Sequence, residues 1–176
     1  MKNGEECDRY QPARQFSRAL ELVDNIPYLL MGLCGSALLL AGLGNSLAGW
    51  LAAGGYLAYT LGGALWIMVF VCPYCHYHGT RACPCGYGQI SARLTPKRPE
   101  NRFARQFRKH IPVIVPLWLI PLAAGIAFYV GNPSQLILVL LIVFAVDAFV
   151  LLPLVSRLYG CGHCPQKTDC PWMVKG

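Results

Sequence analysis

Long apolar stretches alternate with short polar ones along this chain. No Asp, Glu, Lys or Arg occurs between Asp24 and Arg81. Between His110 and Arg157, the only charged residue is Asp147. A helix needs about twenty apolar residues to cross roughly 30 Å of hydrocarbon, so each stretch is long enough for two crossings. Gly and Asn interrupt each stretch near its middle, which predicts a tight turn there.

The pattern predicts an all-α membrane protein with four transmembrane helices, short interfacial helices, and a Cys-rich cytoplasmic loop and tail. We expect spans at about 26–43, 47–71, 111–130 and 135–159. The chain then divides into an N-terminal tail (1–25), a helical hairpin (26–71), a basic loop (72–110), a second hairpin (111–159) and a C-terminal tail (160–176). The N-terminal tail carries both acidic and basic residues, unlike a cleavable secretory signal, so we expect the first helix to stay in the mature chain.

Composition agrees with a membrane protein and excludes an ordinary soluble domain. Of the 176 residues, 55% are hydrophobic and only 13% are charged, whereas about a quarter is typical of soluble domains. The formal net charge is +7. Eight of the basic residues lie between Arg81 and Lys109, against the single acidic residue Glu100, while the two expected turns carry no charge. By the positive-inside rule, the basic loop and both termini face the cytoplasm, which predicts the inner, cytoplasmic membrane.

The same positive charge predicts which partners the chain meets. Basic residues beside transmembrane helices interact with anionic lipid head groups, each contributing on the order of 1 kcal/mol, so nucleic acid is not expected. Two segments have the apolar spacing of interfacial helices, one from Phe16 to Val23 and one containing Phe103 and Phe107. For the first segment, a solvated connector is an equally good interpretation.

Seven of the nine cysteines gather in two short stretches, and each stretch begins where an expected span ends. The candidate metal ligands are Cys72, Cys75, Cys83, Cys85, Cys161, Cys164 and Cys170. Thiols stay reduced in the cytoplasm, which favours metal binding over a disulfide. Two thiolates three positions apart can converge on one tetrahedral ion about 2.3 Å from each sulfur. The pair Cys72 and Cys75 and the pair Cys161 and Cys164 are therefore predicted to complete one four-cysteine site.

A second site is predicted from the remaining thiols of the two stretches. Cys83, Cys85 and Cys170 supply three ligands, and Cys7 of the N-terminal tail is a candidate for the fourth. Three histidines beside the thiols are additional candidate ligands: His76, His78 and His163. Cys34 lies inside the first expected span and is interpreted as a small buried apolar residue.

The metal stays open between an iron–sulfur cluster and zinc. Four of the cysteines are followed by proline, as in cluster-binding loops, which favours iron–sulfur slightly. The neighbouring histidines suit zinc. An iron–sulfur centre predicts membrane-associated electron transfer with a soluble redox partner or a quinone. Zinc predicts a non-enzymatic adaptor whose loop and tail are stapled together, and a third hypothesis is thiol–disulfide exchange or the handling of soft metal ions. The sequence identifies no catalytic residue.

Asp147 is the one formal charge expected at bilayer depth, where insertion costs about 2.5 to 3.5 kcal/mol. A residue whose insertion costs that much has either a functional role or a hydrogen-bond partner. The functional roles that we consider are proton acceptance beside a quinone and coupling to ion movement. As a partner, the alternative is a hydrogen bond that serves bundle specificity, from Tyr56, Tyr59, Thr60 or Asn45.

Overall fold

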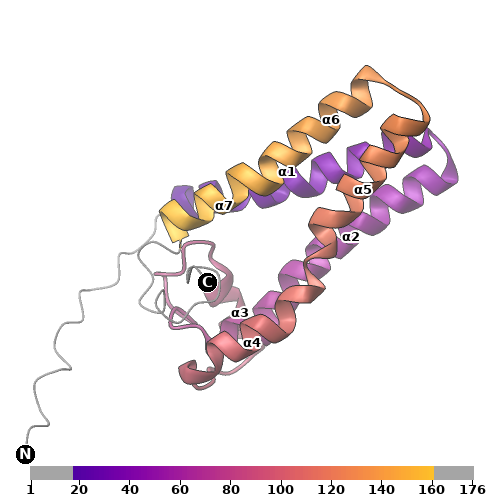
Figure 1. Cartoon of the computed structure of the whole chain (residues 1–176). Coiled ribbons are helices and arrows are strands. Elements are labelled where there is room, and N and C mark those ends of the chain that lie inside the picture. Colours follow the sequence, from indigo (N-terminus) through magenta and orange to yellow (C-terminus); the bar gives the residue numbers. More distant parts are fainter. Residues whose placement is uncertain (1–17, 161–176) are drawn as a thin grey trace, which may run out of the picture.

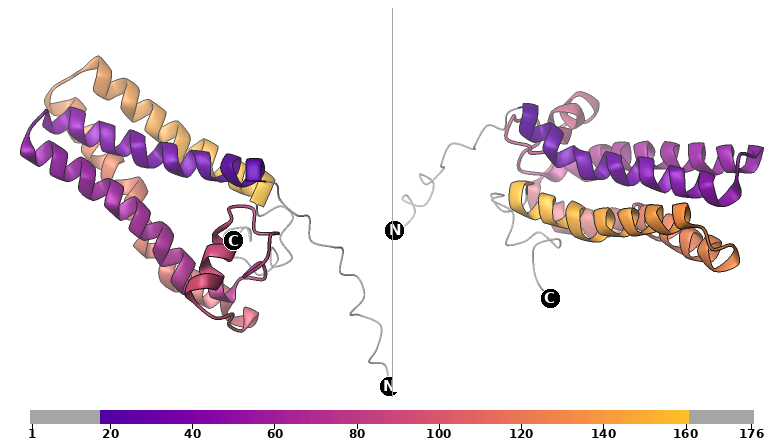
Figure 2. Two further views of the ribbon diagram at one scale, coloured as in Figure 1. Left: turned by 180° about the vertical axis from the view of Figure 1, so that it is seen from behind. Right: turned by 90° about the horizontal axis from the view of Figure 1, so that it is seen from above.

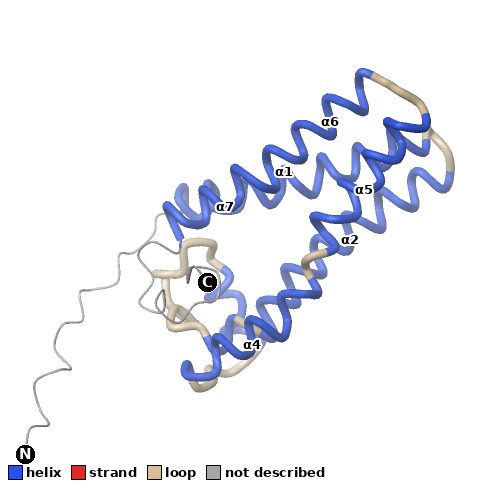
Figure 3. Tube along the Cα trace, viewed as in Figure 1, coloured by secondary structure: helices blue, strands red, loops and turns tan. Residues whose placement is uncertain are grey.

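The computed structural model describes residues 18–160, which form helices joined by turns and one long loop (Figure 1). Within these residues there is no β-strand, and Figure 3 shows helix along most of the trace. The α-helices are α1 (Arg18–Leu43), α2 (Leu47–Phe70), α3 (Tyr87–Leu94), α4 (Phe103–His110), α5 (Pro116–Gly131), α6 (Gln135–Val146) and α7 (Leu152–Val155). Short 3-10 turns cover Cys72–Tyr74, Glu100–Arg102 and Ile111–Val113, and π-helical segments cover Asp147–Leu151 and Ser156–Gly160.

Four helical segments are long and apolar enough to cross a membrane. They are Glu21–Leu43, Leu47–Tyr74, Glu100–Gly131 and Gln135–Leu158. The prediction of an all-α chain with four candidate spans is therefore confirmed for the described residues. The first helix begins earlier than the expected residue 26, because the polar residues from Arg18 onward continue α1 instead of forming a separate interfacial helix.

The four spans form two arms that meet at one end and separate at the other (Figures 1 and 2). Helix α1 packs against α2, α5 and α6. The turns between α1 and α2 and between α5 and α6 lie together at the joined end (Figure 1). At the separated end, the loop that follows α2 and helix α3 lie between the arms (Figure 2). This arrangement places the cysteine-bearing loop at the end of the bundle opposite the uncharged turns.

The turn from α1 to α2 is specified by its local sequence. Gly44 takes a positive φ of 71°, which side-chain-bearing residues rarely adopt, and so ends α1. The Ser46 hydroxyl then accepts a hydrogen bond from the Gly49 N–H at 3.1 Å and caps α2. Trp50 donates from its indole nitrogen to the Asn45 side-chain oxygen at 2.7 Å. Both backbone and side chains therefore hold the tight turn that the Gly and Asn pattern predicted.

Small residues let the helices of the bundle approach closely. A methyl group at Gly35 would overlap the ring of Tyr56, and one at Gly42 would overlap the ring of Phe128. Close packing of this kind is the main source of helix association in a bilayer, where apolar surface gains little from leaving lipid. In contrast, Gly54, Gly55 and Gly62 of α2 have open space around them, so no close helix contact forms at these positions within the described chain.

Helix α2 supplies hydrogen bonds where prolines interrupt the third span. Pro121 has no N–H, so the carbonyl of Leu117 four residues earlier loses its helical donor. The Tyr56 hydroxyl donates to that carbonyl at 2.7 Å. One turn earlier, the Tyr59 hydroxyl donates to the carbonyl of Val113. In a bilayer, such freed carbonyls need a partner from a neighbouring helix, and two tyrosines of α2 provide it.

The fourth span is one helical rod with a wider π-helical turn in its middle. The Leu152 N–H donates to the carbonyl of Asp147, five residues earlier. The next residue, Pro153, has no N–H, so the usual bond to the carbonyl of Phe149 cannot form. A proline that removes one bond of the regular ladder explains why the helix widens here.

Candidate functional site

The loop that follows α2 carries four of the predicted thiol ligands and is folded tightly on itself. The Cys75 N–H donates to the Cys72 carbonyl at 3.0 Å, and the His78 N–H donates to the Cys75 carbonyl at 3.1 Å. The Gly79 N–H donates to the Gly88 carbonyl at 3.0 Å, which closes the loop between its two halves. This bond closes the segment that carries Cys83 and Cys85, and Cys72 and Cys75 lie just before that segment.

Helices α1 and α2 hold the loop from opposite sides. The buried Ser91 hydroxyl of α3 donates to the Met68 carbonyl of α2 at 2.6 Å. On the other side, the Asn25 side chain of α1 donates to the Cys85 carbonyl at 3.0 Å and to the Glu21 carbonyl at 2.7 Å. The loop therefore bridges the two arms of the bundle, and a single side chain fixes the backbone of Cys85.

Cys83 and Cys85 face each other across a turn. The Gly86 N–H donates to the Cys83 carbonyl at 3.2 Å, and Gly86 takes a positive φ of 74°. This turn brings the Sγ atoms of Cys83 and Cys85 to 3.6 Å apart. The Gly88 N–H, in the first turn of α3, donates to the Cys83 sulfur at 3.2 Å. The sulfur of Cys83 thus accepts a backbone hydrogen bond in a buried position.

The pKa values of the two thiols in this turn are shifted in opposite directions. The Cys85 S–H hydrogen bond, helped by the Gly88 N–H, lowers the pKa of Cys83 to about 7 although burial opposes the shift. The same hydrogen bond, together with burial, raises the pKa of Cys85. The arrangement therefore favours a Cys83 thiolate that accepts a hydrogen bond from a protonated Cys85 thiol.

The other two cysteines of the loop lie near this pair. Cys75 and Cys85 pack against a small cluster that contains Cys83 and Tyr77. Cys72, in the 3-10 turn that ends the second span, lies within electrostatic range of Cys75 and Cys83. The structure therefore gathers the four loop thiols in one region. Within residues 18–160, however, no three His, Cys, Asp or Glu side chains are close enough to hold one metal ion together.

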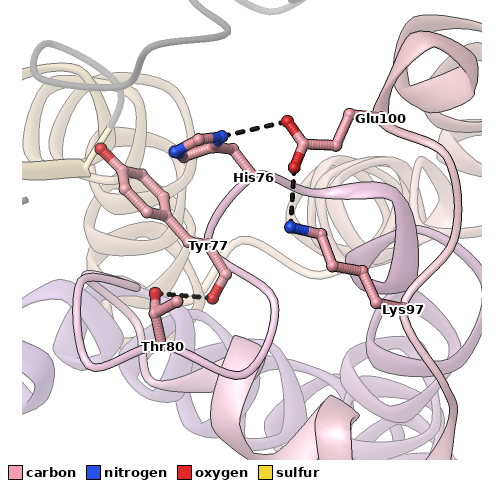
Figure 4. Close-up of polar contacts among 5 residues, drawn as sticks. All are labelled: His76, Tyr77, Thr80, Lys97 and Glu100. Carbon is pink, nitrogen blue, oxygen red and sulfur yellow. Dashed lines mark hydrogen bonds and ion pairs between the residues drawn. The ribbon is translucent and has the colours of Figure 1, made fainter. Parts of the chain in front are cut away.

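The predicted ligand His76 is engaged in a polar network at the edge of the loop (Figure 4). Its Nδ1 lies 3.0 Å from Glu100 Oε2, and Lys97 Nζ lies 2.8 Å from Glu100 Oε1. Next to it, the Thr80 hydroxyl donates to the Tyr77 carbonyl at 3.0 Å. The network ties the cysteine loop to the segment that leads into α4.

Three other residues considered in the sequence analysis have definite positions. His78 is buried, and its Nε2 has no hydrogen-bond partner among the described residues. Cys34 is buried in the apolar core of the bundle, as expected. Asp147 is 1% exposed in the π-helical segment of the fourth span. The predicted ligands that lie outside the described residues are Cys7, Cys161, His163, Cys164 and Cys170.

Two residues that anchor the loop, Asn25 and Ser91, were not singled out by the sequence, whereas Gly88 belongs to a glycine-rich segment that the sequence does mark. Asn25 and Ser91 anchor the loop through side-chain hydrogen bonds, and Gly88 provides the N–H that reaches Cys83. A methyl group at Gly88 would lie 2.6 Å from the Tyr77 carbonyl oxygen. The glycines of the Cys83–Gly88 segment were a usable signal, because glycine lets backbone approach sulfur closely. Asn25 and Ser91 carried no comparable signal.

Comparison with known protein families, with curated proteins and with solved structures gives no match to this chain. The geometry of the thiol loop and of the four spans is therefore what bears on function.

Proposed function

We propose that this chain is a multi-pass membrane protein whose thiols bind a metal centre, an iron–sulfur cluster, in membrane-associated electron transfer. The described ligands are Cys72, Cys75, Cys83 and Cys85, and the remaining ligands come from the tail thiols and Cys7. The cluster supplies one-electron chemistry, and the protein supplies thiolates, hydrogen bonds to sulfur and exclusion of water. The partners that fit this role are a soluble redox protein and a membrane quinone.

The observation that carries the proposal is the geometry of Cys83 and Cys85. Two thiolates bound to one tetrahedral ion at about 2.3 Å lie roughly 3.8 Å apart. The observed separation of their sulfurs is 3.6 Å, so the pair needs little movement to bind an ion. The N–H bond from Gly88 to Cys83 is the kind of contact that supports thiolate ligands. The pair thus fits half of a tetrahedral thiolate site, which the other cysteines complete.

We place the thiol loop and both termini on the cytoplasmic side of the inner membrane. The basic residues between the second and third spans support this, because the two turns at the opposite end of the bundle are uncharged. The basic segment also fits anionic lipid head groups as partners. Labelling of Cys75 by an impermeant maleimide in inverted, but not in right-side-out, membrane vesicles is the expected result.

The test of the metal centre is anaerobic purification followed by metal, acid-labile sulfide and absorption measurements. We expect iron and sulfide in the wild-type protein and in Cys34→Ser, the matched control in the bundle core. We expect most of both to be lost in Cys83→Ser and Cys85→Ser. Folded protein without iron or sulfide would refute the iron–sulfur proposal. Equal loss of iron and sulfide in Cys34→Ser would show that the loss does not depend on the thiols of the loop.

Zinc is the second candidate, and His76 is the observation that favours it. Metal-binding histidines usually donate their second ring nitrogen to a carboxylate, and His76 Nδ1 lies 3.0 Å from Glu100 Oε2. In this alternative, zinc staples the loop and tail of a non-enzymatic adaptor. Stoichiometric zinc without sulfide, lost in His76→Ala, would favour it over an iron–sulfur cluster.

Thiol–disulfide exchange is the third candidate. One thiol of lowered pKa beside a thiol of raised pKa is the asymmetry that dithiol redox pairs use. The exchange would oxidise Cys83 and Cys85 to a disulfide while a partner disulfide is reduced to two thiols. Metal-free protein with a reversible Cys83–Cys85 disulfide would favour this function over both metal centres.

A further inference from the structure

Asp147 combines complete burial with unsatisfied hydrogen-bonding capacity. Its side chain is 1% exposed, and neither carboxylate oxygen has a hydrogen-bond partner in the part of the chain that the structure describes. Buried polar groups in proteins are almost always hydrogen-bonded, and an exception inside a membrane span calls for an explanation.

The sequence offered four donors that would make Asp147 purely structural, and the first two are occupied elsewhere. The Tyr56 hydroxyl donates to the Leu117 carbonyl at 2.7 Å. The Thr60 hydroxyl donates to the carbonyl of Tyr56 at 2.9 Å, within α2 itself. Each hydroxyl has a single proton, so neither residue has one left to give to the carboxylate.

Neither of the remaining two candidate donors gives a hydrogen bond to Asp147. The Tyr59 hydroxyl donates to the carbonyl of Val113. Asn45 lies in the exposed turn between α1 and α2, where its side-chain oxygen accepts from Trp50 at 2.7 Å. None of the four expected partners therefore forms the hydrogen bond with Asp147 that would make its role one of bundle specificity alone.

The backbone around Asp147 departs from the α-helix. Asp147 begins the π-helical segment, and the Leu152 N–H reaches back five residues to its carbonyl. Pro153 follows and has no N–H to donate. π-helical turns occur frequently at functional sites. Interrupted helices at membrane depth are a common feature of intramembrane ion sites.

The surroundings of Asp147 contain few groups that can carry charge. The segment packs against α1, α6 and α7. Helices α6 and α7 contain no ionisable residue. On α1, the buried thiol of Cys34 interacts electrostatically with Asp147. The ion pairs of the described residues join His76 and Lys97 to Glu100, so an ion pair within the described chain does not neutralise the Asp147 carboxylate.

We propose that Asp147 is an intramembrane cation site that binds and releases a small monovalent cation, either a proton or Na⁺. The cation neutralises the carboxylate inside the bundle, next to Cys34 and at the break in the fourth helix. This role is independent of the thiol loop, which lies outside the apolar core. The four-span bundle then does more than anchor the thiol loop. Binding and release of the cation at Asp147 are linked to the conformation of the fourth helix.

The test is labelling of the full-length protein, in lipid vesicles, with dicyclohexylcarbodiimide, which modifies protonated carboxyl groups in apolar surroundings. Peptide mass spectrometry locates and quantifies the adduct. Two parallel series vary pH at constant salt, and NaCl against choline chloride at constant pH. Asp147→Asn removes the adduct, Asp147→Glu keeps it, and Cys83→Ser separates this site from the thiol loop because it should leave the labelling unchanged.

For a proton site, we expect the adduct to fall about tenfold per pH unit above its midpoint and to ignore sodium. For a sodium site, we expect NaCl to suppress the adduct while choline chloride does not. An adduct whose yield is constant across pH and salt would overturn the proposal, because a fixed structural carboxyl behaves in that way. Absence of any adduct on Asp147 in monodisperse wild-type protein would overturn it as well. Both readouts come from the wild-type chain, so misfolding of Asp147→Asn does not affect them.

Discussion

Replacement of Tyr56 by Phe tests how the bundle accommodates the proline of α5. The substitution keeps the ring that packs against Gly35 and removes only the hydroxyl that donates to the Leu117 carbonyl at 2.7 Å. Tyr56 is 5% exposed and Leu117 is 0% exposed, so water does not replace the lost donor. Hydrogen bonds between helices in membranes contribute about 0.6 kcal/mol on average and up to about 1.7. A buried carbonyl left without a donor costs about 1 to 3 kcal/mol.

We therefore expect Tyr56→Phe to lower the free energy of unfolding by about 1.5 kcal/mol, near the top of the membrane range. The assay is equilibrium unfolding in mixed micelles with increasing dodecyl sulfate. The informative comparison is the Pro121→Ala background, in which position 121 regains an N–H that donates to the Leu117 carbonyl within α5. In that background, the cost of Tyr56→Phe should fall to about 0.5 kcal/mol or less.

Tyr59→Phe is the matched control for this double-mutant cycle. Tyr59 donates to the carbonyl of Val113, which lies four residues before position 117 and not before 121. The cost of Tyr59→Phe should thus be the same with Pro121 and with Ala at that position. Equal costs of Tyr56→Phe in the two backgrounds would refute the account of how α2 satisfies α5.

Three further predictions concern helix packing and the thiol loop. Gly42→Ala should lower the free energy of unfolding by about 1 to 3 kcal/mol, because the methyl group overlaps Phe128, whereas Gly54→Ala should be neutral in the same unfolding assay. In metal-free protein, alkylation of Cys83 by iodoacetamide should rise with pH through a midpoint near the pKa of about 7 that the Cys85 thiol and the Gly88 N–H impose, and a midpoint near 9 would contradict this. Gly88→Ala should reduce metal affinity by about 10- to 100-fold, because it displaces the N–H that supports Cys83, and metal titration of this variant and of Gly54→Ala checks it.

The fold was predictable from the sequence to the extent that it follows from apolar length. Two long apolar stretches, each divided by a Gly and Asn turn, were sufficient to predict four candidate spans, and Gly44 and Ser46 form one of these turns as expected. The start of α1 was not predictable from hydropathy, because its first turns are polar and helical together. The π-helical turn at Asp147 left a trace in the sequence, Pro153, but a proline alone predicts a break and not its form.

The sequence indicated which loop residues carry the candidate thiols, but not how those thiols are arranged. The sequence assigned Cys83 and Cys85 to a second site with Cys170 and Cys7. The 3.6 Å separation of their sulfurs depends on a turn closed by Gly86, which the sequence did not predict. The anchor from Asn25 to the Cys85 carbonyl joins residues 60 positions apart. Contacts of that kind depend on how α1 and the loop meet in space, and periodicity carries no information about it. The pairing of the loop thiols with Cys161, Cys164 and Cys170 stays a prediction.

X-ray absorption at the metal edge of anaerobically purified wild-type protein tests the central claim most directly. The proposed iron–sulfur centre predicts iron with a shell of sulfur neighbours at about 2.3 Å and a second shell of iron. It also predicts that the sulfur shell is lost when Cys83 and Cys85 are both replaced by Ser. A folded protein whose bound metal has only nitrogen and oxygen neighbours, or which binds none, would contradict the account.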